Sequence, residues 1–467
     1  MLRRTKIVCT LGPAVNSESK IRALIRAGMN VARINCSHGD WETRKQWIKW
    51  IRKHSPTLAP IGILADLQGP KFRLGVIEGG ELEIKAGKTV QIGPSAVVPI
   101  TQPQILDKMK VGDRLLLGDG DVELKLISQQ GENFTARAIS GGRVKTKQGV
   151  TLVGKVFKTS CITPKDIEDA REAAALEVDF VALSYVHGAS DIEELRELLA
   201  PLNPHIKLCA KIETRDAVNN IAALARVSDV IMVARGDMGL QMDIEDVPLA
   251  QKRVIRAAQD AGKPVITATQ MLESMTRAPR PTRAEATDVA NAILDGTDAV
   301  MLSGETASGD YPLEAVRYMA RIAKKAESMF DNEHWMEDHV IGRADETLAV
   351  SCAVADLAAV LHPKAILTTT TSGQTARLVS KFRPRSPILC ATWSIYTYRQ
   401  LSIVWGVESL FMPLPSTTDE QIHNAIERFV QVKRLKAGDN VVVSAGVPAG
   451  RPGNTNLIMI QKVEPQG

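Results

Sequence analysis

Two acidic residues, Glu213 and Asp237, each follow a short apolar run, and Lys211 stands two residues before Glu213. Carboxylates with open positions beside them suit Mg²⁺ or Mn²⁺, which bind one or two carboxylates together with substrate oxygens. Residues two apart on a strand share a face, so Lys211 and Glu213 are expected to point together. A lysine beside a divalent metal can neutralise a phosphoryl group during its transfer. A salt bridge from Lys211 to either carboxylate is the structural alternative.

A second group of polar residues follows another apolar run. Arg33, Asn35 and Ser37 alternate along the chain and therefore share one face. An arginine there can clamp phosphate or carboxylate oxygens. Asn35 and Ser37, beside Asp66, offer oxygens that a monovalent cation accepts, although the same residue types also cap helices.

Glycines on either side of Asp237 offer a weaker sign of anion binding. Gly236 and Gly239 allow a ligand to approach the backbone closely where a helix begins. The Gly-x-x-x-x-Gly-Lys-Ser/Thr motif does not occur in the sequence, which argues against a P-loop kinase.

The polar residues named above lie at or near the ends of short β-branched runs. The chain has eight such runs, and they alternate with helical patterns. Near-continuous apolar strands between helices indicate a parallel sheet covered on both faces. Eight such units predict a closed (β/α)8 TIM barrel, in which chemistry gathers at the C-terminal strand ends. The runs are Lys6–Thr10, Asn30–Ile34, Ile61–Ala65, Phe180–Leu183, Leu208–Ile212, Val230–Val233, Val265–Ala268 and Ala299–Leu302.

The barrel pattern is interrupted once and then followed by a different pattern. We expect the barrel in residues 1–70 and 156–331, an inserted β cap domain in 71–155, and a C-terminal α/β domain with an open sheet in 332–467. The insert is predicted to be a small β-barrel or sandwich that excludes water from the site, with a decorative insertion as the alternative. Its expected strands are Phe72–Val76, Glu81–Ile84, Thr89–Ile92, Arg114–Leu117, Val122–Ile127 and Phe134–Ile139. The C-terminal elements expected are the helices Glu346–Leu361 and Gln374–Lys381 and the strands Ala365–Thr369, Ile388–Ala391, Asn440–Ser444 and Asn456–Val463.

Composition narrows the class of protein. The 467 residues are 44% hydrophobic and 24% charged with a net charge of +5, which is typical of a globular protein of two or three domains. The densest basic stretch, Lys381–Arg385, is predicted to be a solvated helix end, with an anionic effector site as the alternative; nucleic-acid binding is disfavoured. Six scattered cysteines and the lack of an apolar run of roughly 18 residues favour a cytoplasmic protein without a membrane span.

Long ordered motifs in the chain resemble those of the pyruvate kinase family. The stretches that carry the resemblance are Arg33–Gly39, Lys211–Glu213, Met232–Asp237, Ala268–Met275, Pro281–Ala292 and Met301–Ala307. The resemblance runs from Arg4 nearly to the C-terminus. It implies transfer of a phosphoryl group from phosphoenolpyruvate to ADP, giving pyruvate and ATP in glycolysis, with Mg²⁺ or Mn²⁺ as cofactor. It also implies a homotetramer.

The resemblance assigns roles around the reacting groups. Lys211 would stabilise the phosphoryl group in flight while Glu213 and Asp237 hold the divalent metal. The backbone of Gly236 and Asp237, with Thr269, would hold the substrate carboxylate, and Thr269 would lie near the carbon that receives a proton. Which group delivers that proton stays open.

Further roles concern the surroundings of the site. Arg33 and Arg73 would contact phosphates, and Ser303 and Glu305 would form the supporting shell and proton path. The nucleotide side would be formed by Asn35, His38 and Arg73. A monovalent-cation site, if present, would be formed by Asn35, Ser37, Asp66 and Leu67.

The chain also departs from the family pattern. Potassium-dependent relatives carry a Glu where Lys71 stands, and a fixed ammonium could replace the charge of K⁺, so K⁺-independent activity is expected. Gln148 and His187 stand where Lys and Arg are usual, which predicts weaker ADP binding or a preference for GDP. The sequence Gly118-Asp119-Gly120 likewise replaces Asp-Asp-Gly.

A C-terminal loop resembles the family's site for an effector phosphate. It comprises Thr370, Thr371, Ser372, Gly373 and Thr375. A Ser/Thr/Gly turn that opens a helix offers N–H groups to an anion. Gln374 stands where Arg is frequent, so the loop is either a site for a phosphorylated effector or a plain turn.

Two other functions compete with the kinase. One is a metal-dependent aldolase or lyase acting on the enolate of pyruvate, which would form pyruvate without ADP. The other is a non-catalytic metabolite sensor that keeps the fold but binds nucleotide poorly.

Overall fold

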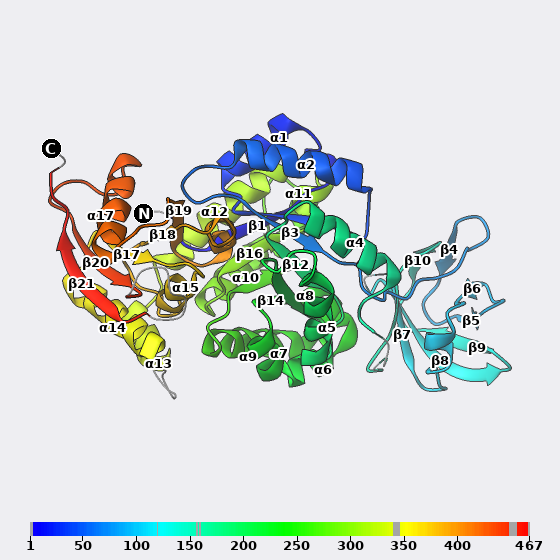
Figure 1. The fold of residues 1–467 in the computed structure, drawn as a ribbon. Helices are drawn as coiled ribbons and strands as arrows, with labels where there is room; N and C mark the ends of the chain where they lie inside the picture. Colours follow the sequence, from blue (N-terminus) through cyan, green and yellow to red (C-terminus); the bar gives the residue numbers. More distant parts are fainter. Residues whose placement is uncertain are drawn as a thin grey trace.

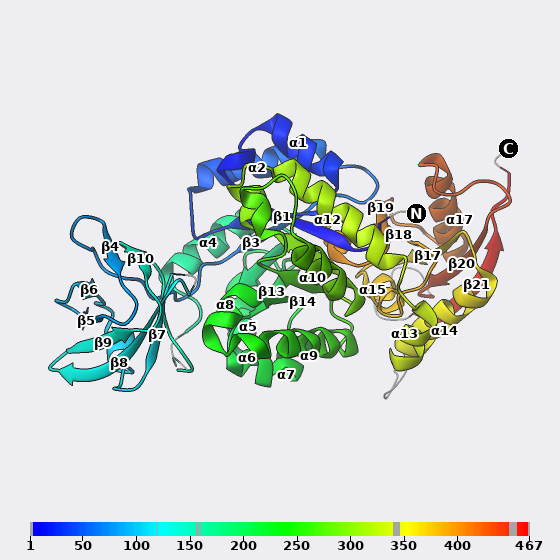
Figure 2. The same ribbon diagram turned by 180° about the vertical axis from the view of Figure 1, so that it is seen from behind.

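The computed structural model describes residues 3–118, 120–155, 157, 160–339, 346–447 and 455–465, so Asp119 of the Gly118-Asp119-Gly120 stretch lies outside the described residues. Three bodies lie in a row, with the barrel in the middle (Figure 1). The inserted β domain projects from one side of the barrel and the C-terminal domain from the other, as the reverse view also shows (Figure 2). No described helix is both long and apolar enough to cross a bilayer.

The central body is a closed barrel of eight parallel strands, as the sequence predicts. All eight predicted runs form its strands, with ends that differ by one residue at most. Nearly every strand residue is buried, because side chains on one face fill the barrel and those on the other meet the helices. In barrel order the strands are β1 (Lys6–Thr10), β16 (Ala299–Leu302), β15 (Val265–Ala268), β14 (Val230–Ala234), β13 (Lys207–Ile212), β12 (Phe180–Leu183), β3 (Gly62–Asp66) and β2 (Val31–Asn35).

Helices surround the barrel, and their ends follow local sequence signals. Thr163 and Asp166 form a capping box at the start of one helix, and Gly28, at φ 127°, ends another. The α-helices are α1 (Glu18–Ala27), α2 (Trp41–His54), α4 (Pro164–Ala175), α5 (Ala189–Leu199), α6 (Arg215–Asn219), α7 (Ile221–Val227), α8 (Arg235–Gln241), α9 (Val247–Asp260), α10 (Arg283–Leu294), α11 (Gly304–Ala307) and α12 (Pro312–Glu327). Short 3-10 helices are η1 (Pro13–Val15), η2 (Ile244–Asp246), η3 (Glu273–Thr276) and, beyond the barrel, η4 (Leu401–Ile403).

The insert contains two sheets around a small apolar core of its own. The six-stranded sheet has the order β11 (Val150–Leu152), β7 (Arg114–Leu117), β8 (Val122–Gln130), β9 (Asn133–Ala138), β5 (Thr89–Gly93) and β6 (Val98–Pro99). The second sheet pairs β10 (Gly142–Lys145) with β4 (Glu81–Ile84). A short helix, α3 (Pro103–Leu106), lies between β6 and β7 in the chain.

The prediction of a strand at Phe72–Val76 in the insert is wrong. Only an isolated bridge joins Arg73 to Gly149. The segment divides its hydrogen bonds between two partners: Leu74 N donates to Gln148 O at 2.8 Å, and Gly75 N donates to Pro99 O at 2.8 Å. It therefore follows no single strand.

The C-terminal domain is an open five-stranded sheet, as expected. Its order is β19 (Val407–Phe411), β18 (Ile388–Thr392), β17 (Ala365–Thr369), β20 (Asn440–Ala445) and β21 (Leu457–Lys462), and β21 alone is antiparallel to its neighbour. The strand β19 was not predicted. The helices are α13 (Asn332–His339), α14 (Glu346–Leu361), α15 (Gln374–Lys381), α16 (Ile395–Gln400) and α17 (Thr418–Gln431).

A continuous apolar core joins the C-terminal domain to the barrel. It includes Ala376 and Val379 of α15 together with Val8 and Val31 of the barrel. In Figure 1, α15 lies on the side of the sheet that faces the barrel. The two bodies therefore share buried surface, which couples their stability.

The basic stretch Lys381–Arg385 is not a solvated helix end at its centre. Arg383 is 2% exposed and its Nη1 lies 2.9 Å from Asp298 Oδ1 in the barrel. Its Nη2 donates to Gly296 O at 2.6 Å, and the guanidinium lies over the ring of Trp405. The prediction was wrong because a partner from the other domain compensates the buried charge.

Candidate active site

The lysine and the carboxylate at the end of β13 lie on one face, as the sequence predicts. Lys211 Nζ is 2.9 Å from Glu213 Oε1 and 3.2 Å from Asp66 Oδ1. It also donates to Ser184 Oγ at 2.6 Å. The salt bridge to Glu213 that formed the structural alternative is thus present, and it holds the ammonium at the mouth of the barrel.

Burial sets the charges of this group. It raises the pKa of Glu213 to about 7, because Lys211 only partly offsets the desolvation and Asp237 adds repulsion. Burial opposes the charge of Lys211, but Asp66 and Glu213 outweigh it and raise the Lys211 pKa above its ordinary value. Burial also acts against ionised Asp66, yet Lys211 and Arg33 hold the Asp66 pKa below its usual range. A further cation beside Glu213 would favour the ionised form of that carboxylate.

Arg33 connects neighbouring strands at the rim of the barrel. Its Nε lies 2.7 Å from Asp66 Oδ2, and its Nη1 donates to Thr10 Oγ1 at 3.0 Å. Asn35 and Asp66 are directly paired between β2 and β3. Arg33, Asp66 and Lys211 consequently form one charged network around the site.

The residues expected around a monovalent cation are partly engaged by the protein. Asn35 Oδ1 accepts a hydrogen bond from Ser37 N at 3.0 Å, which is the capping geometry of the alternative interpretation. The backbone oxygen of Leu67 accepts from Ser184 Oγ at 2.8 Å. These oxygens lie on the rim beside Asp66 but already have donors.

The first turn of α8 meets the loop that follows β15. Gly236 N donates to Thr269 Oγ1 at 2.7 Å, and a Cβ at Gly236 would lie 3.3 Å from that oxygen. Thr269 and Gln270 both have left-handed φ angles, +69° and +52°. Strained backbone of this kind is held only by its surroundings and is typical of functional loops.

The donor set fits a divalent metal. Within the described chain, no three His, Cys, Asp or Glu side chains gather into a metal site. Glu213 and Asp237 are two carboxylates, the number with which Mg²⁺ is often bound when substrate supplies further oxygens. Glu213 Oε1 is buried without an aligned hydrogen bond despite its ion pair, and the side chain of Asp237 is 29% exposed. Oxygens of both residues are therefore available to a cation.

Arg235 is a residue whose role the sequence did not reveal. Its Nη1 lies 2.6 Å from Asp288 Oδ1, and its Nη2 donates to Thr269 O at 2.9 Å. The guanidinium thus fixes the backbone of the loop that carries Thr269. In the sequence, only its position at the end of a predicted barrel strand indicated a role in the site.

Ser184 was also missed, although it ends a predicted strand. It accepts from Lys211 and donates to Leu67, so it joins the lysine to the rim. Beside it, Tyr185 N donates to Glu213 Oε2 at 2.9 Å. These partners orient Lys211 and Glu213.

Ser303 and Glu305 follow β16, the neighbour of the strand β15 that precedes Thr269. Glu305 is fully buried, and its two oxygens accept from Leu272 N at 3.1 Å and Ser303 N at 2.7 Å. Burial raises the pKa of Glu305. Ser303 Oγ has no protein hydrogen-bond partner within the described chain. Glu305 therefore holds two loops together, and the Ser303 hydroxyl remains available.

The expected nucleotide side is strongly positive. Burial lowers the pKa of His38, and Arg73, Lys71 and Arg33 lower it further. Arg73 Nη1 donates to Lys147 O at 3.1 Å, which ties this arginine to the cap. A neutral histidine among three cations suits a polyphosphate ligand.

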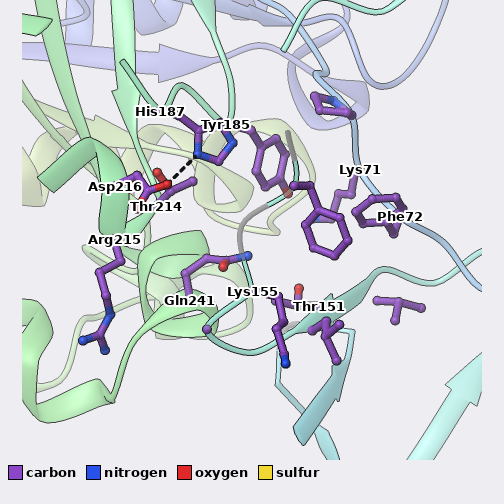
Figure 3. Close-up of a pocket in the computed structure, with 15 residues that line it drawn as sticks. Lys71, Phe72, Thr151, Lys155, Tyr185, His187, Thr214, Arg215, Asp216 and Gln241 are labelled. Atoms are coloured by element: carbon purple, nitrogen blue, oxygen red, sulfur yellow. Dashed lines mark ion pairs between the residues drawn. The ribbon is translucent and has the colours of Figure 1, made fainter. Parts of the chain in front are cut away.

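A pocket lies between cap and barrel beside the carboxylates, with about 760 Å³ of space between atoms. In Figure 3, Tyr185 and Gln241 extend toward its middle, Phe72 lies on the cap side, and Arg215 points away. His187 Nδ1 and Asp216 Oδ2, 3.6 Å apart, form its edge. Lys71 lines the pocket and its Nζ lies 3.6 Å from Asp237 Oδ1, so the pocket adjoins a residue expected to hold the divalent metal.

The C-terminal loop that was expected to bind an effector is partly closed by its own hydroxyls. Gly373 N donates to Thr370 Oγ1 at 3.0 Å, and Gln374 N lies 3.4 Å from Ser372 Oγ. Thr397 Oγ1 donates to Thr371 O at 2.7 Å, and Thr375 Oγ1 lies 2.6 Å from Thr455 Oγ1. Gly373 adopts φ +78°.

Comparisons with known proteins agree over almost the whole chain. Residues 2–316 match the family model "Pyruvate kinase, barrel domain", and residues 348–461 match "Pyruvate kinase, alpha/beta domain". Pyruvate kinases of Staphylococcus aureus strains USA300 and NCTC 8325 are each 44% identical over 472 residues, covering 99% of this chain and 81% of the relative. A crystal structure of a pyruvate kinase from Cryptosporidium parvum aligns with a TM-score of 0.90 and 33% identity, covering 99% of this chain and 96% of that one. The chain therefore belongs to the pyruvate kinase family.

Proposed function

We propose that this enzyme transfers the phosphoryl group of phosphoenolpyruvate to ADP at the mouth of the barrel, in a Mg²⁺- or Mn²⁺-dependent reaction. The observation that carries the proposal is the Lys211 ammonium held 2.9 Å from Glu213 and 3.2 Å from Asp66. A cation fixed in this way can neutralise a phosphoryl group in flight without reorganisation.

Glu213 and Asp237 are the residues that would hold the divalent ion. When bound, such an ion supplies Lewis-acid polarisation and neutralises charge on phosphoryl oxygens. Lys211 and Arg33 hold the transferred group from the barrel side. Asp66 keeps both cations in place.

The substrate carboxylate is proposed to bind where α8 begins. The proposed donors are the backbone N–H groups of Gly236 and Asp237 and the Thr269 hydroxyl. Gly236 N donates to Thr269 Oγ1 and that hydroxyl donates to Ala268 O at 2.6 Å, so a bound carboxylate would replace these two hydrogen bonds. Ser303 and Glu305 are proposed to support Thr269 and the path of the proton.

The nucleotide is proposed to bind at Asn35, His38 and Arg73. Gln148 uses its Oε1 to accept from Lys145 N at 2.8 Å, and it brings no charge to the phosphates. At the position where an arginine is usual, the chain has His187, whose Nδ1 lies 3.6 Å from Asp216 Oδ2. Both features support weaker ADP binding or the use of GDP, which a panel of nucleoside diphosphates would test.

Independence of K⁺ is proposed from Lys71. Its Nζ lies 3.6 Å from Asp237 Oδ1, so a fixed positive charge already stands beside the substrate side of the site. An ammonium that belongs to the protein does not have to bind from solution, so its charge stays in the site at low K⁺ concentration.

Three further features are proposed from family resemblance. The loop formed by Thr370, Thr371, Ser372, Gly373 and Thr375 binds a phosphorylated effector. The enzyme is an allosteric homotetramer. It acts in glycolysis in the cytoplasm.

The deciding experiment is coupled pyruvate formation from phosphoenolpyruvate, ADP and Mg²⁺ by wild type, Lys211→Met and the exposed control Lys325→Met. We expect ADP-dependent activity in wild type and the control, and a collapse in Lys211→Met. Pyruvate formed without ADP would favour the lyase. Folded protein without activity would favour the sensor.

A further inference from the structure

A second polar pocket lies at the opposite end of the barrel from the carboxylates. It is lined by Lys207, the first residue of β13, by Lys263 just before β15, and by Arg377 of α15. About 650 Å³ of space lies between its atoms, part of it open to solvent. Because α15 belongs to the C-terminal domain and faces the barrel (Figure 1), the pocket spans the junction of two bodies.

Positive charge predominates in this pocket. The only carboxylate that lines it among the described residues is Asp229, whose Oδ1 lies 3.3 Å from Lys207 Nζ. Asp229 Oδ2 already accepts from Leu208 N at 3.0 Å and pairs with Arg196 at 3.4 Å. Three cations against one shared carboxylate leave an excess of about two positive charges.

The guanidinium of Arg377 has donors to spare. Its Nη1 donates to Ser372 O at 3.0 Å, and no other acceptor contacts the guanidinium in the described part of the chain. Lys263 Nζ donates to Ser228 O at 2.6 Å, which fixes that ammonium at the pocket wall. An arginine with free N–H groups beside two lysines presents a ready site for a multi-oxygen anion.

Electrostatics agree with this geometry. Burial lowers the pKa of Lys263, and although Asp229 opposes this, Arg377 and Lys207 lower the pKa further. Burial lowers the pKa of Arg377 as well. The cations therefore repel one another in a partly dry pocket, and a bound anion would relieve that repulsion.

Much of the remaining wall is apolar, and the amides of Gln374 and Gln400 complete it. Phe180, Leu378 and Val404 line it together with other apolar side chains. A ligand with an anionic end and a flat or apolar remainder would bury both parts. A carboxylate would neutralise one charge, whereas a phosphomonoester carries nearly two negative charges at pH 7 and matches the excess.

We propose that this pocket is a binding site for an organic phosphate, a phosphomonoester with a flat or apolar group, held between Lys207, Lys263 and Arg377. The site is separate from the proposed catalytic chemistry and can be tested without turnover. Since the ligand contacts barrel and C-terminal domain together, its binding stabilises the junction and raises the melting temperature.

Isothermal titration of the full-length protein with phenyl phosphate is the direct test. Inorganic phosphate and phenol are the reference ligands, because each carries only one part of phenyl phosphate, the anion or the aromatic ring. We expect phenyl phosphate to bind more tightly than either half and to raise the melting temperature. Absence of phenyl phosphate binding at millimolar concentration, or binding no tighter than inorganic phosphate, would overturn the proposal.

Binding measurements on variants show which residues hold the ligand. Arg377→Met and Lys207→Met should each weaken phenyl phosphate binding by about tenfold or more, because each removes a charge-assisted hydrogen bond. The exposed control Lys325→Met should bind as wild type does. Thr371→Ala removes only binding at the effector loop and should keep the binding that depends on Arg377 and Lys207. Loss in Thr371→Ala with retention in the two pocket variants would assign the ligand to the loop and refute the pocket. Circular dichroism and melting of the unliganded variants show whether each remains folded; with two independent variants, one misfolded protein leaves the test intact.

Discussion

Lys71 Nζ lies 3.6 Å from Asp237 Oδ1, so a residue of the cap hinge faces a proposed metal ligand of the barrel. If this ammonium replaces a monovalent cation, wild-type activity should hardly change when KCl replaces an organic chloride at the same ionic strength. Lys71→Glu should lower activity in the absence of K⁺ by about tenfold or more, equivalent to ~1.4 kcal/mol of barrier, and added K⁺ should restore part of it.

The control for this prediction is Lys71→Met, which removes the charge without supplying an acid to bind K⁺. Its activity should fall without a comparable response to K⁺. A wild-type rate that rises many-fold on addition of K⁺ would refute the proposed role of Lys71.

Arg235 is expected to be a positioning residue for the Thr269 loop. Arg235→Met removes charge-assisted hydrogen bonds to Asp288 and Thr269 O, each worth about 1.5–3 kcal/mol, so kcat should fall about 10- to 100-fold. The melting temperature should fall as well, because the same hydrogen bonds are lost from the fold. Arg235→Lys should not restore kcat, since one ammonium cannot serve both partners.

The exposed Arg253→Met on α9 is the matched control and should leave kcat unchanged. A rise in KM alone, or full activity in Arg235→Lys, would contradict a role in orienting the loop. Steady-state kinetics for both substrates distinguish these results.

Local patterns in the sequence were sufficient to predict the barrel. Its strands are β-branched runs bounded by turns and helices, so each could be recognised without knowledge of its partners. The pair Lys211 and Glu213 could be placed on one face for the same reason, because a strand alternates its side chains. The strand expected at Phe72–Val76 failed since its backbone bonds two separate segments, Gln148 and Pro99.

Contacts between distant segments could not be predicted in the same way. The link from Ser184 to Lys211 depends on which strands become neighbours, and that from Arg235 to Thr269 depends on a loop with left-handed backbone. The burial of Arg383 depends on Asp298, which lies 85 residues earlier in the chain. A basic residue near a helix end looks solvated unless its partner is known.

Arg383 should contribute strongly to stability. Arg383→Met would leave Asp298 buried beside an apolar chain, and loss of one partner of a buried pair costs about 3–5 kcal/mol. The midpoint of urea unfolding, followed by tryptophan fluorescence near Trp405, should therefore fall clearly. The exposed Arg22→Met should not shift it. The double variant Arg383→Met with Asp298→Asn should recover part of the loss; strictly additive losses would show that the two residues are not coupled.

Lys6 should make stability depend on pH. It is 5% exposed, and its Nζ donates to Val407 O at 2.6 Å across the junction of barrel and C-terminal domain. Burial lowers its pKa from 10.5 to about 8, with Glu408 opposing the shift. In the unfolded chain the lysine holds its proton up to about pH 10.5, whereas the folded protein releases it near pH 8. Unfolding therefore takes up a proton between these values, and stability contributed by Lys6 rises with pH across that window.

The comparison of wild type with Lys6→Met separates the contribution of Lys6 to the pH dependence of stability from that of other titrating groups. The difference in unfolding free energy should be constant below about pH 8 and shift in favour of wild type above it, by up to ~3 kcal/mol at pH 10.5. Lys325→Met, which replaces an exposed lysine, should give a difference that does not vary with pH. Parallel stability curves for wild type and Lys6→Met would show that Lys6 titrates alike in both states. That outcome would also mean that the hydrogen bond to Val407 O offsets the cost of burying the charge.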